Sequence, residues 1–207
     1  MTNVVPSGSP RGVDARIRKA PYAECWRCPL RDNQMVPGDP IKSDARYTIV
    51  AESPGQDEAI AAKKGQGRPL IGPSGRLLWA LLGKLEVSRD QCNVTNAVLC
   101  QPPSNYDEKQ GVLSVAMTCC SKRLAAELEQ ARGSRVLALG KTAREAFFGP
   151  EQPHESITTL HGRWIDWSGH WVLSTYHPAY ILRDPDNART MFDDVQKFVT
   201  DKHPQIP

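Results

Sequence analysis

Short apolar runs of strand character alternate with longer runs of helical character along this chain, and this alternation restricts the possible folds more than any other feature. Runs of Val, Leu, Ile and Ala bounded by Gly or Pro predict buried strands, and apolar residues at helical spacing predict the helices between them. The predicted strands are 46–52, 93–98, 134–140 and 171–175, and the predicted helices are 75–82, 112–132, 141–148 and 187–201. Such alternation favours a three-layer α/β/α fold around a central, mainly parallel four-stranded sheet.

The segments between these elements predict loops and one hairpin. Residues 53–73 are rich in Gly and Pro, which indicates a long loop, with Ser74 as the N-cap of the next helix. Trp164 to Trp167, followed by Ser168 and Gly169, indicate a hairpin that leads into the last strand.

Length and composition fit one packed domain behind a short lead-in. The chain has 207 residues, of which 40% are hydrophobic and 24% charged, as in ordinary globular domains. Residues 1–20 are rich in Pro, Gly, Ser and Arg without apolar periodicity, which predicts a flexible basic N-terminal lead-in. We expect one domain at residues 21–204.

The charge distribution and the apolar runs restrict location and partners. The lead-in carries the whole net charge of +3, so the rest of the chain is balanced and does not coat nucleic acid through bulk charge. No apolar run approaches the roughly 20 residues of a membrane span, and the N-terminus has no apolar signal core. We therefore expect a cytoplasmic protein with no membrane partner.

Three polar residues fall at the exits of three predicted strands, and they are Glu52, Asn96 and His177. The exits of parallel strands meet at one edge of the sheet, where α/β proteins bind ligands. There a carboxylate can orient water, an amide can read the edge of a planar heterocycle, and an imidazole can bond an oxygen that gains negative charge. The alternatives are an ordinary strand-end acid, a turn asparagine and a buried histidine with structural partners.

A basic stretch follows the first strand exit. No acid occurs between Glu58 and Glu86, and the cations there are Lys63, Lys64, Arg68, Arg76 and Lys84. The helix predicted to start in this stretch offers free backbone N–H groups, which suit a phosphate. The alternative is a solvated basic face.

The cysteines indicate a possible metal site. Cys25 and Cys28 form a CxxC pair, and Cys100 with Cys119 or Cys120 could complete four ligands. An intracellular chain of this size needs no disulfide framework. The spacing alone leaves iron–sulfur, zinc and no metal open.

Five segments, taken in order, resemble the motifs of the family 4, iron–sulfur-containing uracil-DNA glycosylases. The set is specific although each motif alone is not, and the resemblance runs from about Cys25 to Lys202. The matching segments are AESPG at 51–55, GRPLIGPSGRLL at 67–78, TNAVLCQPPSN at 95–105, LG at 139–140 and HPAYILR at 177–183.

The resemblance implies the uracil-DNA glycosylase fold and an enzyme of base excision repair. Such an enzyme flips a nucleotide out of DNA and hydrolyses the N-glycosidic bond of uracil, or of a related pyrimidine, to leave an abasic site. It implies DNA as the partner, action as a monomer and a prokaryotic or phage-type source. The implied residues are Glu52 and His177 for catalysis, Leu70, Asn96 and Gly55 for the base, and Ser74, Gly75 and Arg183 for DNA phosphates.

The resemblance also implies a structural 4Fe-4S cluster. Its ligands would be Cys25, Cys28, Cys100 and Cys120, because the family places a leucine four residues beyond the last ligand and Leu124 fits that spacing. Cys119 is the alternative to Cys120. Cys92 is expected to be a buried strand residue.

Two departures from the family pattern suggest alternatives. Leu70 replaces an aromatic residue expected to stack on the base, and residues 59–66 lengthen the link between Gly55 and Gly67. The first alternative is a glycosylase specific for a modified pyrimidine. The others are a catalytically inactive DNA-binding homologue and a zinc-binding protein unrelated to DNA.

Overall fold

The computed structural model describes residues 19–104, 106–149 and 156–201. Apart from Lys19 and Ala20, the predicted lead-in lies outside the described residues, and so does the end of the predicted domain at 202–204. Among the described residues no helix is long and apolar enough to cross a membrane.

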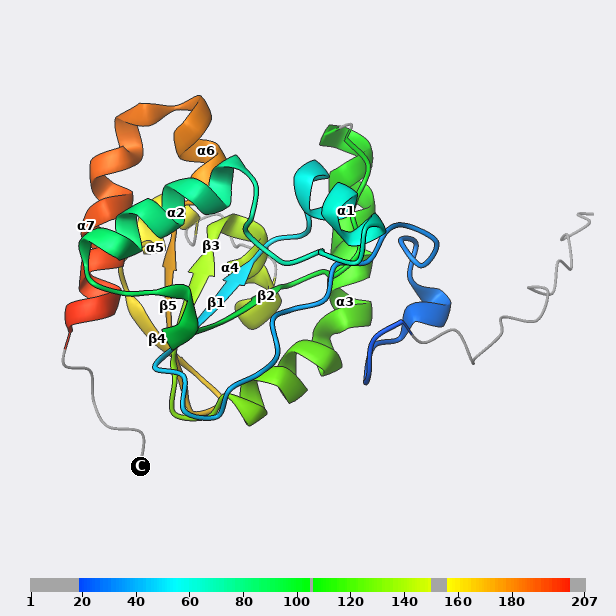
Figure 1. Ribbon diagram of the computed structural model, residues 1–207, viewed down its shortest axis with the longest axis horizontal. Helices are drawn as coiled ribbons and strands as arrows, with labels where there is room; N and C mark the ends of the chain where they lie inside the picture. The colour runs from blue at the N-terminus through cyan, green and yellow to red at the C-terminus, as the bar shows by residue number, and fades with distance from the viewer. Residues whose placement is uncertain (1–18, 105, 150–155, 202–207) are drawn as a thin grey trace, which may run out of the picture.

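A five-stranded sheet in the order β2-β1-β3-β5-β4 forms the centre of the molecule (Figure 1). Four of its strands are parallel, as predicted. They are β1 (Tyr47–Ala51), β2 (Cys92–Asn96), β3 (Arg135–Leu139) and β5 (His170–Thr175).

The sheet has one strand more than the four predicted, because the predicted hairpin pairs fully with its neighbour. β4 (Trp164–Trp167) runs antiparallel to β5 at the edge of the sheet. Ser168 and Gly169 both have positive φ, of 50° and 82°, which is the turn geometry that a two-residue hairpin requires.

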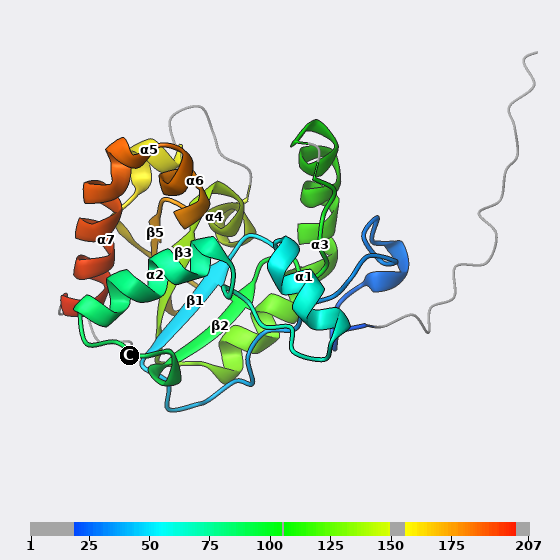
Figure 2. The ribbon, with the colours of Figure 1, turned by 45° about the horizontal axis from the view of Figure 1, so that its top comes forward.

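Helices cover both faces of the sheet, which confirms the three-layer α/β fold (Figures 1 and 2). Alternate strand residues point to opposite faces: Ile49 packs in a cluster with α2 and α7, while Val50 packs in a cluster with α3 and α4. The helices are α1 (Gln56–Lys63), α2 (Pro73–Lys84), α3 (Tyr106–Gln130), α4 (Gly140–Phe148), α5 (Ile157–Leu160), α6 (Pro178–Arg183) and α7 (Ala188–Thr200), with short 3-10 turns at Cys25–Arg27, Arg89–Gln91 and Pro185–Asn187.

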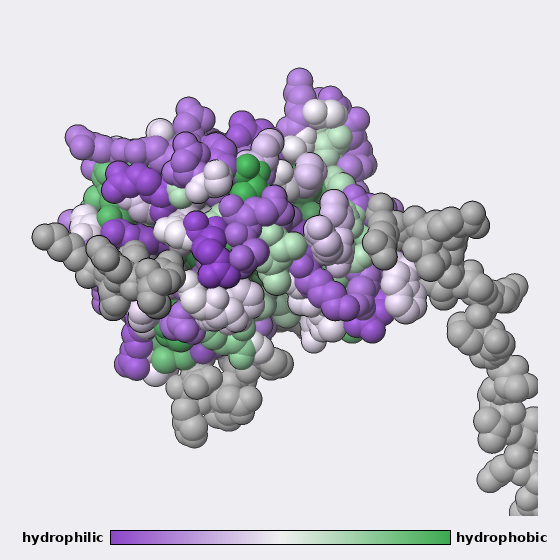
Figure 3. Space-filling model, turned by 90° about the horizontal axis from the view of Figure 1, so that it is seen from below, coloured by the Kyte–Doolittle hydropathy of each residue, from purple (hydrophilic) through white to green (hydrophobic). Residues whose placement is uncertain are grey.

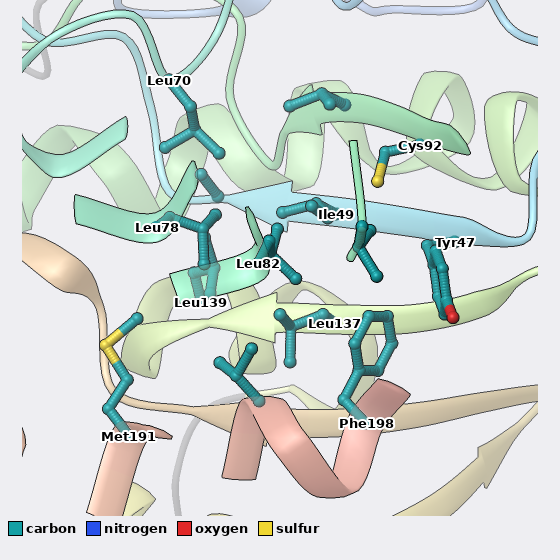
Figure 4. Packing of buried hydrophobic residues seen from close by; sticks show 14 of the residues in the cluster. Tyr47, Ile49, Leu70, Leu78, Leu82, Cys92, Leu137, Leu139, Met191 and Phe198 are labelled. Atoms are coloured by element: carbon teal, nitrogen blue, oxygen red, sulfur yellow. The ribbon is translucent and has the colours of Figure 1, made fainter. Parts of the chain in front are cut away.

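The larger core lies under α2 and α7 (Figure 4). The rings of Tyr47 from β1 and Phe198 from α7 stand 5.2 Å apart between their centroids. Leu70 belongs to the same core and reaches it from the loop that precedes α2. The face seen from below in Figure 3 is mostly hydrophilic, with small apolar areas scattered over it.

Two local predictions are corrected by the structure. The predicted loop 53–73 contains the helix α1, with Glu58 and Ala59 buried on its inner side. Helix α2 begins at Pro73 with Gly72 as its N-cap, so Ser74 lies inside the first turn and is not the cap. Proline suits the first helical position because its missing N–H would have no partner there.

The segment before β1 packs against α3 and the loop after β2, on the right of Figure 1. The backbone N–H of Glu24 donates to Cys119 O at 2.8 Å, and that of Val36 donates to Leu99 O at 2.8 Å. These bonds bring Cys25 and Cys28 close to Cys100, Cys119 and Cys120.

Candidate active site

A cavity of about 770 Å³ opens beside the carboxyl ends of the parallel strands. Glu52 after β1, Asn96 at the end of β2 and His177 after β5 all line it, so the structure brings the three predicted residues together. Four of the other predicted residues line the same cavity, namely Gly55, Leu70, Ser74 and Arg183. Gly75 does not line it and packs behind Leu70.

The Glu52 carboxylate is held by the start of α4. Thr142 Oγ1 donates a hydrogen bond of 2.6 Å to Glu52 Oε2. The backbone on either side is fixed to the exit of β2, because Ala97 N donates to Ala51 O at 2.7 Å and Val98 N donates to Glu52 O at 3.0 Å. These bonds hold the Glu52 carboxylate and the Asn96 side chain on neighbouring sides of the cavity.

The side chain of Asn96 lines the cavity from the end of β2. Its side chain belongs to a residue only 2% exposed. Within the described part of the chain, Nδ2 is buried and donates no hydrogen bond. A buried polar group without a partner costs free energy, so this donor is suited to a ligand that enters the cavity.

The His177 ring is held in one tautomer by its own helix. The backbone N–H of Ala179 donates to His177 Nδ1 at 3.1 Å, so that nitrogen is an acceptor and the ring proton of the neutral form sits on Nε2. Gly140, with φ of 82°, lies directly beside the backbone and Cβ of His177: a Cβ on Gly140 would stand 2.8 Å from His177 Cβ. Only glycine permits this approach of the two strand exits.

Leu70 forms a wall of the cavity in a strained backbone conformation. Its φ is 56°, which is uncommon for a residue other than glycine. Trp79 Nε1 donates to Leu70 O at 3.0 Å, and a Cβ on Gly75 would stand 1.8 Å from the same oxygen. Helix α2 therefore fixes Leu70 through Trp79, and Gly75 permits the close approach of the Leu70 backbone to the helix.

Glu58 supports the same wall from α1, and the sequence analysis missed it. Its Oε1 accepts hydrogen bonds from Ile71 N at 3.1 Å and Gly72 N at 3.0 Å, and the residue is 7% exposed. Thr142 was missed as well. Neither stands out in the sequence, because an acid on a short helix and a threonine at a helix start are common.

Part of the predicted basic stretch is already paired. Arg68 Nε donates to Asp39 Oδ1 at 2.9 Å, and Arg89 Nε donates to Asp39 Oδ2 at 2.9 Å. Arg89 also donates to Pro69 O at 2.8 Å. Arg68 thus belongs to the support of the Leu70 loop, whereas Lys63 and Lys64 are exposed at the end of α1.

Five of the six cysteines surround another, small cavity. They come from the segment before β1, the loop after β2 and α3, and they are Cys25, Cys28, Cys100, Cys119 and Cys120. Burial raises the pKa of the Cys28 thiol to about 12 and that of Cys100 to about 11. Cys92 is the first residue of β2 and fully buried, away from this cavity, which agrees with the expectation for it.

The cysteine cavity has the donors that an iron–sulfur cluster needs. Thiolates are the usual ligands of such clusters, and a cluster of several irons separates its ligands more widely than one ion does. Among the described residues no three His, Cys, Asp or Glu side chains are grouped to hold a single metal ion. The sulfur-only composition of the site fits a cluster better than a mixed-ligand ion.

Comparisons with known proteins agree on one family. The family model described as the uracil DNA glycosylase superfamily matches residues 39–201. The type-4 uracil-DNA glycosylase of Thermotoga maritima is 33% identical over 193 residues, covering 89% of this chain and 90% of that protein. The type-4 uracil-DNA glycosylase of Saccharolobus solfataricus is 30% identical, covering 87% of this chain and 81% of that protein.

Proposed function

The chain belongs to the uracil-DNA glycosylase superfamily, and from its likeness to type-4 uracil-DNA glycosylases we propose that it removes uracil from DNA. The reaction hydrolyses the N-glycosidic bond of an extruded nucleotide and leaves an abasic site for base excision repair. The observation that carries the proposal is the single cavity that collects Glu52, Asn96 and His177. We propose that the protein acts inside the cell, on DNA, as a monomer.

Asn96 would select the base. The pairing edge of uracil offers an acceptor at O4 and a donor at N3, and a primary amide complements both. The buried Asn96 Nδ2, which has no partner in the described part of the chain, is the donor for O4. Cytosine carries an amino donor in place of O4, so it would leave this N–H unsatisfied and be rejected.

His177 would stabilise the departing base. Bond breaking leaves negative charge on the base, part of it on O2. Because Nδ1 accepts from Ala179 N, the proton of the neutral ring is on Nε2, and we propose this N–H as the donor to that oxygen. A fixed donor aimed at developing charge typically contributes a factor of about 10² to 10³ in rate.

Glu52 would act on the sugar side. The same bond breaking leaves positive charge on the deoxyribose, which a carboxylate stabilises, and a carboxylate can also orient the attacking water. Thr142 holds Oε2 of Glu52 by a short hydrogen bond. Thr142 is thus a positioning residue for Glu52.

The remaining predicted residues would bind the base face and the DNA backbone. Leu70 and Gly55 would contact the base, and Ser74, Gly75 and Arg183 would hold flanking phosphates. Arg183 is exposed at the end of α6 beside the cavity, where a phosphate can reach it. The amide of Gly75 belongs to the first turn of α2, whose N–H groups have no helical partners.

We further propose that Cys25, Cys28, Cys100 and Cys120 hold a 4Fe-4S cluster, with Cys119 as the alternative fourth ligand. The cluster would supply a cross-link between the N-terminal segment, the β2 loop and α3, and no chemistry in the hydrolysis. The arrangement of these five cysteines around one cavity supports the proposal. Iron and sulfide content and the visible absorbance of the purified protein test it.

The decisive experiment is base release from oligonucleotides that contain U:G, U:A or unpaired U, followed by alkaline cleavage. We expect release from uracil DNA, with a loss of about 10² to 10⁴-fold in Glu52→Ala and His177→Ala. Unchanged rates in both variants would contradict the proposal. A modified-pyrimidine glycosylase or an inactive DNA-binding homologue is not favoured, because the relatives compared are uracil-DNA glycosylases.

A further inference from the structure

Leu70 lies in a loop that has space on both sides. It lines the active-site cavity, and together with Ile71, Trp79 and Arg89 it also lines a cavity of about 620 Å³ beside α2. We call this space the outer cavity. Packing alone leaves the loop room to move toward it, although the φ of 56° at Leu70 is a conformation that persists only where its surroundings hold it.

Arg89 binds the peptide group that precedes Leu70. Its Nη2 donates to Pro69 O at 2.8 Å, and the same guanidinium pairs with Asp39 Oδ2, at 2.9 Å from Nε and 2.8 Å from Nη2. The guanidinium carbon lies 5.0 Å from the centroid of the Trp79 ring, within the range of a cation–π contact. Trp79 Nε1 in turn donates to Leu70 O at 3.0 Å. Arg89 therefore holds the carbonyl before Leu70 directly and supports the carbonyl of Leu70 through the indole.

Asp39 connects this arrangement to the sheet. The residue is 7% exposed, and its backbone N–H donates to Val94 O of β2 at 2.8 Å. Its carboxylate binds two arginines, because Arg68 Nε also donates to Oδ1 at 2.9 Å. The Arg68 side chain is 55% exposed, whereas that of Arg89 is 20% exposed and also reaches Pro69 O. Arg68 shares the ion pair with Asp39 but not the bond to Pro69 O, which makes it a matched control.

We propose that Arg89 is a positioning residue for base binding, which holds Leu70 at the distance that a flipped base requires. The inference rests on the proposed function, in which Leu70 contacts the base. Loss of the guanidinium leaves Pro69 O without its side-chain donor and frees the loop to move toward the outer cavity. Lysine keeps the charge, but a single ammonium does not replace a planar fork that binds a carboxylate and a carbonyl and lies over an indole.

A positioning role and a structural role of Arg89 predict different kinetics. The Leu70 wall contacts the base before and during bond breaking, so a displaced wall weakens binding and raises KM with kcat little changed. A variant that merely folds less well has fewer active molecules, which lowers the apparent kcat and leaves KM as it was. The balance of the two effects therefore separates the roles.

Arg89→Met tests the proposal, with Arg68→Met as the matched control and Arg89→Lys as the conservative variant. For all three, kcat and KM on uracil DNA are measured, together with the inhibition constant of free uracil, which depends on base binding without the DNA flanks. Hydrogen exchange of residues 70–72 is measured without DNA, because two N–H groups of this segment bind Glu58 only while the loop keeps its place.

We expect KM and the inhibition constant of uracil to rise about tenfold in Arg89→Met, the equivalent of about 1.4 kcal/mol of binding free energy, with faster exchange at 70–72. In Arg68→Met we expect a change of at most about twofold, because exposed ion pairs contribute little. Arg89→Lys should show the same pattern with a smaller rise, and it serves as the test if the methionine variant does not fold.

An unchanged KM with a lower kcat in the Arg89 variants, or equal effects in the Arg89 and Arg68 variants, would overturn the proposal. Exchange at 70–72 is measured without DNA and does not depend on base release. Failure of the proposed function is therefore seen separately, as a wild-type protein that releases no uracil.

Discussion

Thr142 and Glu52 follow the carboxyl ends of two neighbouring parallel strands, β3 and β1, and meet in a hydrogen bond of 2.6 Å from Thr142 Oγ1 to Glu52 Oε2. The threonine lies in the first turn of α4, directly after β3, and the glutamate follows β1. The pairing of β1 with β3 in parallel register is what brings the two side chains together.

Replacing Thr142 by Val tests whether this bond holds the carboxylate for catalysis. A hydrogen bond to a charged group contributes about 1.5–3 kcal/mol, so base release should fall roughly 10- to 100-fold. Valine keeps the volume and Thr142→Ser keeps the hydroxyl, so the serine variant should retain most of the rate. Single-turnover release of uracil is the measurement, and equal rates in the valine and serine variants would contradict the role.

Two glycines of α2 should respond in opposite ways to alanine. A Cβ at Gly75 would stand 1.8 Å from Leu70 O, whereas a Cβ at Gly83 meets nothing within 4 Å. Gly75→Ala should therefore displace the Leu70 wall, lower stability and impair base release. Gly83→Ala should leave activity intact and raise the free energy of unfolding by roughly 0.5–1 kcal/mol. Denaturant unfolding and base release of the two variants give the comparison.

Leu70→Phe should increase the affinity for the flipped base. Leu70 lies at the boundary between the cavity and the core, and stacking on an aromatic ring contributes about 1–3 kcal/mol for a nucleobase. We expect a lower KM for uracil DNA, with kcat little changed. Leu70→Met, which is of similar volume without a ring, is the control. A rise in KM with phenylalanine but not with methionine would show that the strained loop does not admit the larger ring.

His170 should make the fold less stable in acid. The residue is 3% exposed, its Nδ1 is buried with no partner in the described part of the chain, and burial lowers its pKa below the ordinary 6.5. The unfolded chain then binds a proton below about pH 6.5 that the folded chain does not, so stability falls as the pH falls through this range and is unaffected above it. Denaturant midpoints measured from pH 7.5 to pH 5 should drop more steeply for the wild type than for His170→Gln.

The chain order of strands and helices was predictable because it depends on local patterns. Glu52, Asn96 and His177 were found for a related reason: each lies at the exit of a predicted strand, and parallel strand ends share an edge. Helix α1 was not predicted, since Gly55, Gly65 and Gly67 surround eight residues with little apolar periodicity. The roles of Thr142 and Glu58 depend on partners at least 13 residues away in sequence, which no local pattern encodes.

Helix α1 has two sides with different tasks. One carboxylate oxygen of Glu58 secures the loop at Ile71 and Gly72, while Ile60, Lys63 and Lys64 on the outer side are exposed. Substitutions on that outer side should therefore alter the affinity for the DNA that flanks the target base without changing which base is accepted. DNA affinity and base specificity of this protein can therefore be changed independently by substitutions on different sides of α1.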